Sequence, residues 1–362
     1  MRGRRALRGG WGRPQRTPSA RTAPPVGWLV GGAVLLVAAG LLGVSAGAAA
    51  ISATDILRHL LSHLPFTGVE SPLNERQVAL LVALRLPRVV MGAIVGALLA
   101  TAGGAYQGVF RNALADPFLL GAAAGAGLGA TLVMVFGQEF TDTPRAAVPF
   151  AAFVGALVGV AAAYLLGSTA GGGGTASLVL AGVAVSSFLS AAQTLVQQMG
   201  VDQLQRVYSW LLGGLGRDGW DDVRLVWPYA LVSLIVLLAC GYLLDMLALG
   251  DDKAVSLGLN PGVVRIIVIS AASLATAAAV AVSGLIGFVG IVVPHVVRRL
   301  VGANYRAILP VTVLFGGAFL VLVDIVARTV VAPAELPIGV VTAFLGAPFF
   351  LLILRTTRHR TT

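Results

Sequence analysis

The feature that most constrains this chain is a series of long apolar runs with few charged residues between them. About 20 apolar residues in a helix, rising 1.5 Å each, cross the hydrocarbon of a bilayer. That length predicts an all-α polytopic membrane protein with ten transmembrane helices, at 27–50, 88–108, 118–137, 147–167, 176–199, 223–246, 264–284, 286–301, 308–330 and 338–355. The run at 286–301 is short and interrupted by Pro294.

Composition excludes an ordinary soluble domain. Of the 362 residues, 57% are hydrophobic and 11% charged, whereas about 25% of a soluble domain is charged. The single cysteine, Cys240, lies in an apolar run and rules out an intrachain disulfide or a cysteine metal cluster.

The net charge of +10 indicates a cytoplasmic tail rather than nucleic-acid binding, because 7 of the 25 basic residues lie in the first 21 positions. We expect a basic cytoplasmic tail at 1–25, one transmembrane domain at 26–356 and a short cytoplasmic tail at 357–362. Lys and Arg in the loops favour both termini in the cytoplasm of a protein of the cytoplasmic membrane. A signal peptide cleaved near GAAAIS is the alternative, but the first apolar run is longer than an ordinary signal sequence.

Two segments resemble each other. An arginine opens both the run from Arg88 and the run from Arg265, and each run leads through glycines into a polar corner that contains proline. Five predicted spans separate them, and an odd offset gives opposite orientations, as in the inverted repeats of transporters. The alternative is that helices rich in Ala, Gly, Leu and Val look alike by chance.

Polar residues inside the apolar runs are candidates for function. The helical spacing of the fifth run places four of them on one face, which predicts a translocation pathway: Ser186, Ser190, Gln193 and Gln197. The alternative is polar packing between helices. Asp324 and Arg328 have the spacing of an intrahelical ion pair, which argues against proton uptake by Asp324.

The connection from Ala248 to Arg265 is long for a membrane hairpin. We expect two short interfacial helices with a turn between them, and the apolar residues Ala254, Val255 and Leu257 indicate a partner surface. The only lysine, Lys253, has neither the preceding Gly nor the following Ser or Thr of a Walker A loop, so we expect no ATP site of that type. No residue pattern supports an enzyme or a metal site.

Several motifs occur in order along the chain: LRLPR at 84–88, Gln107 with RNALADP at 111–117, LLGAAAGAGLGA at 119–130, WLLGGL at 210–215, GFVGIVVPHVVR at 287–298 and ELPIGVVTAFLGAPFF at 335–350. With these motifs the chain closely resembles the FecCD family of ABC-transporter permeases, the type II importers of ferric siderophores, haem and cobalamin. The resemblance covers about 27–355 and leaves the arginine-rich tail outside.

The resemblance implies the type II importer permease fold with an inverted repeat, and a subunit that performs no chemistry. It implies a second permease subunit, in a homodimer or heterodimer, two ATPase subunits that carry ATP and magnesium, and an extracytoplasmic binding protein. The chain itself would bind no cofactor. Ferric siderophore is the first expectation for cargo, with haem or cobalamin as alternatives. An ion-coupled secondary carrier using Asp324 or His295 is the alternative from another class.

The resemblance also implies roles for single residues. The residues expected to dock the binding protein are Arg85, Arg88 and Arg328. Those expected to couple to the ATPase are Asp251, Asp252, Lys253, Ser256, Leu257, Gly258, Leu259 and Asn260. Those expected at structural corners are Gln107, Asn112, Asp116, Pro117, Pro294 and His295.

Two positions depart from the family pattern. Ala113 stands where the motif usually has proline, and Asn304 and Tyr305 stand where an Asp-His pair usually precedes Arg306. Both lie at predicted inner corners, where they could alter the ATPase contact.

Overall fold

The computed structural model describes residues 25–47, 51–62, 70–139, 144–169, 175–216 and 219–358. Within them the regular structure is entirely helical: α1 (Pro25–Ser45), α2 (Ala53–Ser62), α3 (Glu75–Leu80), a π-helical turn (Leu81–Arg85), α4 (Leu86–Phe110), α5 (Ala122–Phe136), α6 (Pro144–Thr169), α7 (Thr175–Met199), α8 (Leu204–Leu211), α9 (Trp220–Ala239), α10 (Gly241–Ala248), α11 (Asp251–Ser256), α12 (Pro261–Ser283), α13 (Val289–Val301), α14 (Tyr305–Thr329) and α15 (Ile338–Arg358). Short 3₁₀ turns follow α5 and α7. The basic tail at 1–24 lies outside the described residues.

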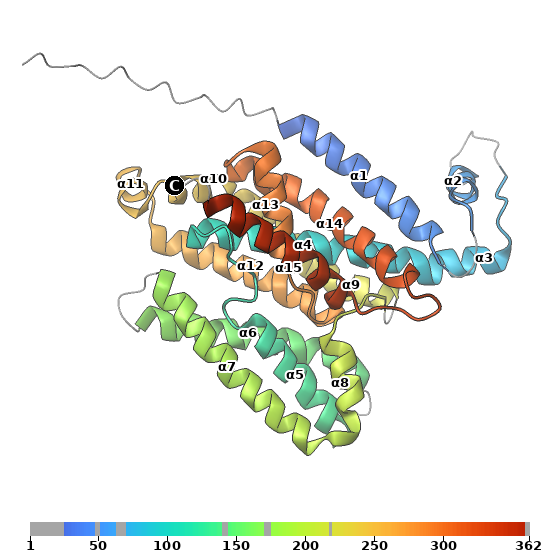
Figure 1. Cartoon of the computed structure of the whole chain (residues 1–362), viewed down its shortest axis with the longest axis horizontal. Helices are drawn as coiled ribbons and strands as arrows, with labels where there is room; N and C mark the ends of the chain where they lie inside the picture. The colour runs from blue at the N-terminus through green and yellow to red at the C-terminus, as the bar shows by residue number, and fades with distance from the viewer. Residues whose placement is uncertain are drawn as a thin grey trace, which may run out of the picture.

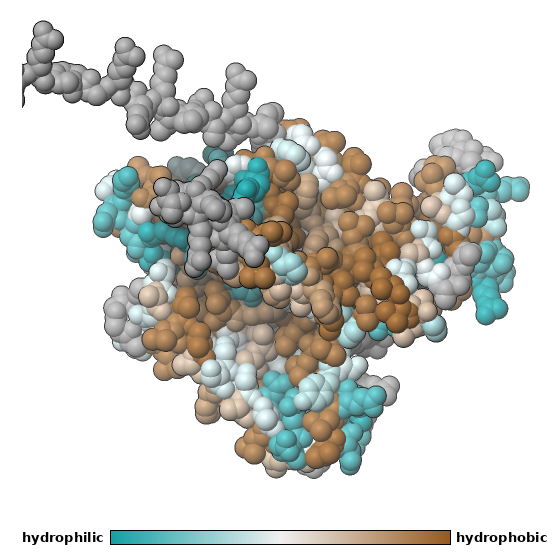
Figure 2. All heavy atoms as spheres, viewed as in Figure 1, coloured by the Kyte–Doolittle hydropathy of each residue, from teal (hydrophilic) through white to brown (hydrophobic). Residues whose placement is uncertain are grey.

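The helices form a bundle with two ends of different character (Figure 1). We call them the α3 end, with α2, α3 and the start of α4, and the α11 end, with α11 and the start of α12. The first turn of α1 and the last turn of α15 both lie toward the α11 end. Apolar residues cover the middle of the face shown in Figure 2, and hydrophilic residues gather at its extremities. This is the surface expected of a protein that crosses a bilayer.

Seven of the described helices are long and apolar enough to cross a membrane: α1, the continuous helix Glu75–Phe110, α6, α7, α9, α12 and α14. Two shorter apolar helices are Ala122–Phe136 and Ile338–Leu352. The prediction of ten spans is therefore not confirmed by helix length among the described residues. The expected third and eighth spans shorten for visible reasons. Residues 113–121 form turns before α5, and Phe288 has a left-handed φ of 67° immediately before α13.

The second span is much longer than expected. The continuous helix that contains α4 has 36 residues, which at 1.5 Å each is about 54 Å against roughly 30 Å of hydrocarbon. Its first turns therefore project beyond the membrane at the α3 end. The connection between α10 and α12 also differs from the prediction, because it contains one short helix, α11, and then a turn. Asn260 caps α12 there by accepting the N–H groups of Gly262 and Val263, so the second expected helix is already the start of α12.

The core is built around α4 and α12, which run in opposite directions, as the inverted-repeat interpretation requires. The hydroxyls of Tyr106 and Ser273, one from each helix, share a buried hydrogen bond of 2.7 Å. Elsewhere α4 packs on α13 and α14, while α5, α6 and α7 form a second group that reaches the core through α12. Glycine lets several of these backbones approach closely, for example Gly125 of α5 against Gly155 of α6.

Candidate functional site at the two ends of the bundle

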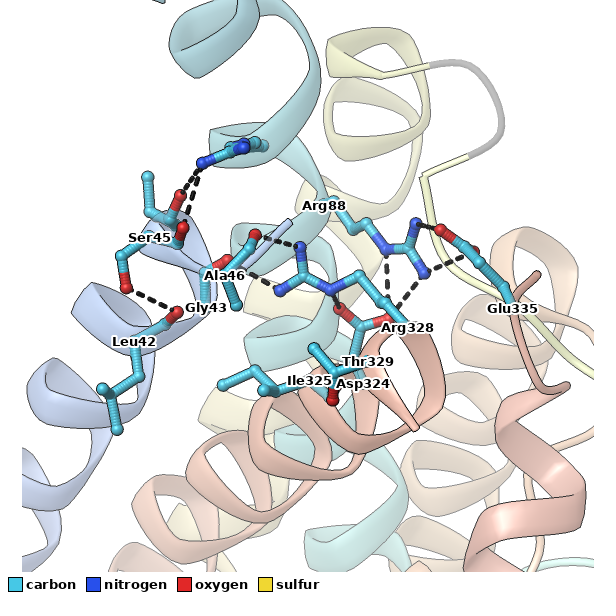
Figure 3. A network of polar contacts seen from close by, with 12 residues as sticks. Leu42, Gly43, Ser45, Ala46, Arg88, Asp324, Ile325, Arg328, Thr329 and Glu335 are labelled. Carbon is cyan, nitrogen blue, oxygen red and sulfur yellow. Dashed lines mark hydrogen bonds and ion pairs between the residues drawn. The ribbon is translucent and has the colours of Figure 1, made fainter. Parts of the chain in front are cut away.

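Arg88 is the centre of a charged cluster at the α3 end (Figure 3). Its guanidinium donates to Asp324 Oδ1 from Nε at 3.0 Å and from Nη2 at 2.9 Å. It also meets both carboxylate oxygens of Glu335, at 3.0 and 2.9 Å. Two parallel N–H···O bonds are the strongest geometry for such a pair. Glu335 lies between α14 and α15, its side chain is 51% exposed, and the pairing with Arg88 holds its pKa below the usual range.

The other two arginines expected to dock the binding protein hold the last turn of α1. Arg328 donates to the carbonyl oxygens of Ala46 at 3.1 Å and Gly43 at 2.6 Å. Arg85 donates to the carbonyls of Val44 at 2.9 Å and Ser45 at 3.1 Å. The final carbonyls of a helix have no partner within it and carry partial negative charge, so cations stabilise them. The arginines therefore attach the peripheral α1 to α4 and α14.

The three arginines expected to dock the binding protein are largely buried within the chain. Arg85 is 9% exposed, and the side chains of Arg88 and Arg328 are 18% and 7% exposed. Long side chains at the outer end of a span can reach water, but here internal acceptors hold them instead. The predicted ion pair between Asp324 and Arg328 is confirmed, with Arg328 Nε 3.1 Å from Asp324 Oδ2. A docking role for the arginines stays a prediction.

The polar face of α7 divides in the structure. Gln193 and Gln197 are buried within the chain, whereas Ser190 is exposed and Ser186 is intermediate. Gln193 lies against α5, where a Cβ placed on Gly127 would come 2.6 Å from its Oε1. Within one chain this position agrees with packing between helices. The pathway role of the four residues stays a prediction.

At the α11 end, one carboxylate of α11 binds two arginines, one from the end of α4 and one from α12. Asp251, the first residue of α11, accepts Arg265 Nη2 through both oxygens at 2.9 Å. It also accepts Nη2 of Arg111, the residue that ends α4 with a left-handed φ of 48°. Farther along α11, Ala254 is buried while Val255 and Leu257 are about 60% exposed. The coupling residues predicted from the sequence thus form a protruding segment with an unpaired apolar face.

The other predicted coupling residues shape this segment or lie on its surface. Asp252, Lys253 and Gly258 are exposed, and Leu259 is half-buried. Ser256 Oγ donates to the carbonyl of Asp252 at 2.9 Å, and Gly258 adopts a φ of +82° at the turn before Asn260.

The polar corner after α4 forms as predicted. The side-chain oxygens of Asn112 and Asp116 accept the N–H groups of Leu114 and Phe118 at 3.0 and 2.7 Å, which closes two successive turns. Burial raises the pKa of Asp116 to about 6. Pro117 packs on α13, where a Cβ on Gly290 would lie 2.5 Å from its Cδ.

Residues of α13 complete the inner corner. Gln107 donates to the carbonyl of Gly290 at 3.2 Å and accepts Arg298 at 3.3 Å. Pro294 is buried inside α13. His295 stands edge-on to Phe349 of α15, 5.9 Å between ring centroids, and neither ring nitrogen has a hydrogen-bond partner within the described structure. That contact agrees with a structural role.

The second departure from the family motif has a clear structural role. Asn304 caps α14 by accepting the N–H of Arg306 at 2.9 Å. The Tyr305 hydroxyl accepts a hydrogen bond from Arg298 Nη2 at 3.0 Å, and the backbone N–H of Tyr305 donates to Asp245 Oδ1 at 2.6 Å. Ala113 is exposed in the turn, and nothing in the structure explains its replacement of proline.

Sequence reasoning missed the contacts that join distant segments, namely those of Arg88 with Asp324, Arg298 with Gln107, and Asp251 with Arg111 and Arg265. The only available signal was the position of each partner beside a recognised motif, because no local spacing connects them. Among the described residues there is no group of three His, Cys, Asp or Glu side chains that could hold a metal ion.

Known proteins similar to this chain are transport permeases with different named cargoes. The cobalamin import system permease protein BtuC of Halobacterium salinarum is 40% identical over 76% of this chain and 73% of its own length. The Fe(3+)-citrate import system permease protein YfmD of Bacillus subtilis is 37% identical over 88% and 91% of the two chains. The hemin transport system permease protein HmuU of Yersinia pestis is 40% identical over 76% and 84%.

A solved structure of a metal-chelate type ABC transporter in an inward-facing conformation superposes with a TM-score of 0.79. It is 30% identical in sequence, and the match covers 91% of this chain and 98% of that one. The model of the FecCD transport family matches residues 35–356. The chain is therefore a multi-pass membrane permease that belongs to the FecCD transport family.

Proposed function

We propose that this chain is the permease subunit of an ATP-driven importer that moves a ferric siderophore across the cytoplasmic membrane by alternating access. The observation that carries the proposal is the α11 segment. It protrudes from an apolar bundle, has its own charged attachment to the core, and exposes Val255 and Leu257. A contiguous apolar surface at a polar end of a membrane protein is suited to a partner protein.

The proposed partners follow from the family. Two ATPase subunits bind the α11 segments of two permease subunits, hydrolyse ATP with magnesium, and move those segments. A binding protein delivers cargo at the α3 end, which then faces outward while both termini face the cytoplasm. Cargo passes between the permeases beside the polar face of α7. The chain itself contributes binding surfaces and movement, and no chemistry.

Docking at the α3 end centres on Arg88 in this proposal. Its carboxylate partner Glu335 is half exposed and can be replaced by a carboxylate of the binding protein. Arg85 and Arg328 support the docking surface by fixing α1.

The ion-coupled alternative lacks support in the structure. Asp324 is 2% exposed and held between two arginines, so it is not placed to exchange a proton with water.

Uptake assays test cargo and partners together. A strain that lacks the chromosomal copy of this gene is complemented with the gene and supplied with radiolabelled ferric siderophore, haem or cobalamin. We expect uptake of the ferric siderophore to depend on the gene and on an ATPase that copurifies with the chain. Gene-dependent uptake of haem or cobalamin alone would transfer the proposal to that cargo. Uptake that persists without any ATPase would overturn it.

A further inference from the structure

Asp251 connects the protruding segment to both central helices. Its carboxylate pairs with Arg265 in the second turn of α12 and with Arg111 at the end of α4. The two arginines come from elements that are 154 residues apart in the sequence, 265 minus 111. No other acidic residue of the described structure pairs with both helices.

The geometry of these contacts suits the transmission of movement. Nη2 of Arg265 donates to both oxygens of Asp251, and the Arg265 side chain is 14% exposed, so the arginine end of the link is largely shielded from water. Hydrogen bonds between two charged groups are shorter and stronger than bonds between neutral groups. Arg111 has a left-handed backbone in the C-terminal cap of α4, and its side chain donates to Asp251 from that position.

A displacement of these ends of α4 and α12 would be transmitted to the middle of the protein. Helix α12 is the most buried of the spanning helices, and α4 is joined to it by the bond between Tyr106 and Ser273. Close-packed helices behave as stiff bodies. A displacement of α11 that is shared by both helices would therefore be carried into the core, whereas without Asp251 α11 would shift while α4 and α12 stayed in place.

We propose that Asp251 is a positioning residue that transmits the movement of α11 to α4 and α12, so that ATP hydrolysis by the partner drives transport. This rests on the proposed function. It adds the specific claim that loss of the Asp251 carboxylate separates hydrolysis from uptake without preventing the partners from binding.

The first experiment measures ATP hydrolysis and cargo uptake separately in the complete complex, reconstituted in liposomes. For Asp251→Asn we expect hydrolysis within about twofold of the wild type and a loss of uptake per ATP of at least about tenfold. Asp251→Glu should recover part of the loss, and Arg265→Gln should reproduce it. Asp202→Asn, which removes an exposed carboxylate between α7 and α8, is the control with unchanged transport.

A comparison within α11 distinguishes the link from the charge of the helix. Asp252→Asn removes the same charge from the neighbouring position, where the structure shows no ion pair. The proposal requires a clearly larger loss of uptake per ATP for Asp251→Asn than for Asp252→Asn. Equal losses would overturn it. So would a parallel fall of hydrolysis and uptake in Asp251→Asn, which would indicate failed assembly.

A second measurement does not depend on transport. Cysteines are introduced by Ser256→Cys and Asn112→Cys in a Cys240→Ser background, and a nitroxide spin label is attached to each. The distance between α11 and the end of α4 is then measured by pulsed electron paramagnetic resonance. We expect Asp251→Asn to broaden the distance distribution. An unchanged distance distribution would overturn the proposed link through Asp251. A wild-type complex that takes up none of the tested cargoes would overturn the proposed function, and the distance measurement would then still test the link.

Discussion

Two adjacent glycines of α4 give a sharp test of how the core is packed. Gly103 faces the backbone of α13, and a Cβ at this position would lie 2.5 Å from the carbonyl carbon of Gly290. Gly104 faces side chains, and its Cβ would lie 3.4 Å from Leu309 Cδ2 and 3.5 Å from Pro294 Cβ. Ordinary contact begins near 3.4 Å. Gly103→Ala therefore requires the two backbones to separate, because the carbonyl oxygen and Cα of Gly290 lie nearer still, whereas Gly104→Ala requires no movement.

The two substitutions gain the same helix propensity but differ in strain. Gly to Ala in a helix interior is worth about 1 kcal/mol in either case. Overpacking a rigid contact costs about 1–3 kcal/mol, and a backbone cannot relieve it by changing rotamer. For Gly103→Ala we expect the strain to lie in the upper part of that range, at about 2–3 kcal/mol, because the contact is with backbone, which leaves a net loss of roughly 1–2 kcal/mol. For Gly104→Ala we expect no loss, or a gain of up to about 1 kcal/mol.

The assay is the midpoint of thermal unfolding of the purified protein in one detergent, followed by size-exclusion chromatography. Gly103→Ala should unfold at a lower temperature than the wild type, and Gly104→Ala at the same temperature or a higher one. Equal midpoints for the two variants, or a Gly103→Ala variant as stable as the wild type, would refute the close approach of α4 and α13.

Three further predictions concern charge. Asp324→Asn leaves the buried guanidinium groups of Arg88 and Arg328 without their shared carboxylate, so we expect the free energy of unfolding to fall by about 3–5 kcal/mol. The double variant Asp324→Asn with Arg328→Gln should recover part of this loss, and no recovery would contradict the pairing of Asp324 with Arg328. Glu335→Gln removes the carboxylate that occupies one side of the Arg88 guanidinium, so the affinity for the binding protein, measured by biolayer interferometry, should rise severalfold relative to the control variant Glu75→Gln. A lower affinity would show that Glu335 does not compete with the binding protein for Arg88. Burial raises the pKa of Asp116 to about 6, above its ordinary value near 4, so the folded protein binds the extra proton and stability should decrease as pH rises from 5 to 7. Asp116→Asn keeps an acceptor for the Phe118 N–H and should abolish that part of the slope; equal slopes with and without the carboxyl group would exclude Asp116 as its source.

Local features of this protein could be predicted from the sequence because the interacting groups are close along the chain. The pair of Asp324 and Arg328 follows from a spacing of four residues in a helix. The turns at Asn112 and Asp116 follow from side chains that accept N–H groups two residues later. The family and its helical fold were predictable for the same reason, since each motif is a continuous string of residues.

The remaining features depend on which distant segments meet. Arg88 and Asp324 are 236 residues apart, and nothing in either motif shows that they share a bond. The burial of Arg85 and Arg328 depends on where α1 ends, which a sequence pattern places only within a few residues. The number of spans is not confirmed by helix length for a related reason, because hydropathy does not register the left-handed Phe288 that delays the start of α13.

The carboxylates at the α3 end reduce the positive charge that an approaching protein meets there. The three arginines expected to dock the binding protein, Arg85, Arg88 and Arg328, would by themselves draw in an acidic partner from a distance. In the structure Asp324 and Glu335 neutralise two of these three positive charges, 3 minus 2. In α2 and α3, Arg58 and Arg76 are matched in number by Asp55 and Glu75. Long-range attraction should therefore be weak and shape should dominate recognition, so that the rate of encounter with a binding protein depends little on ionic strength.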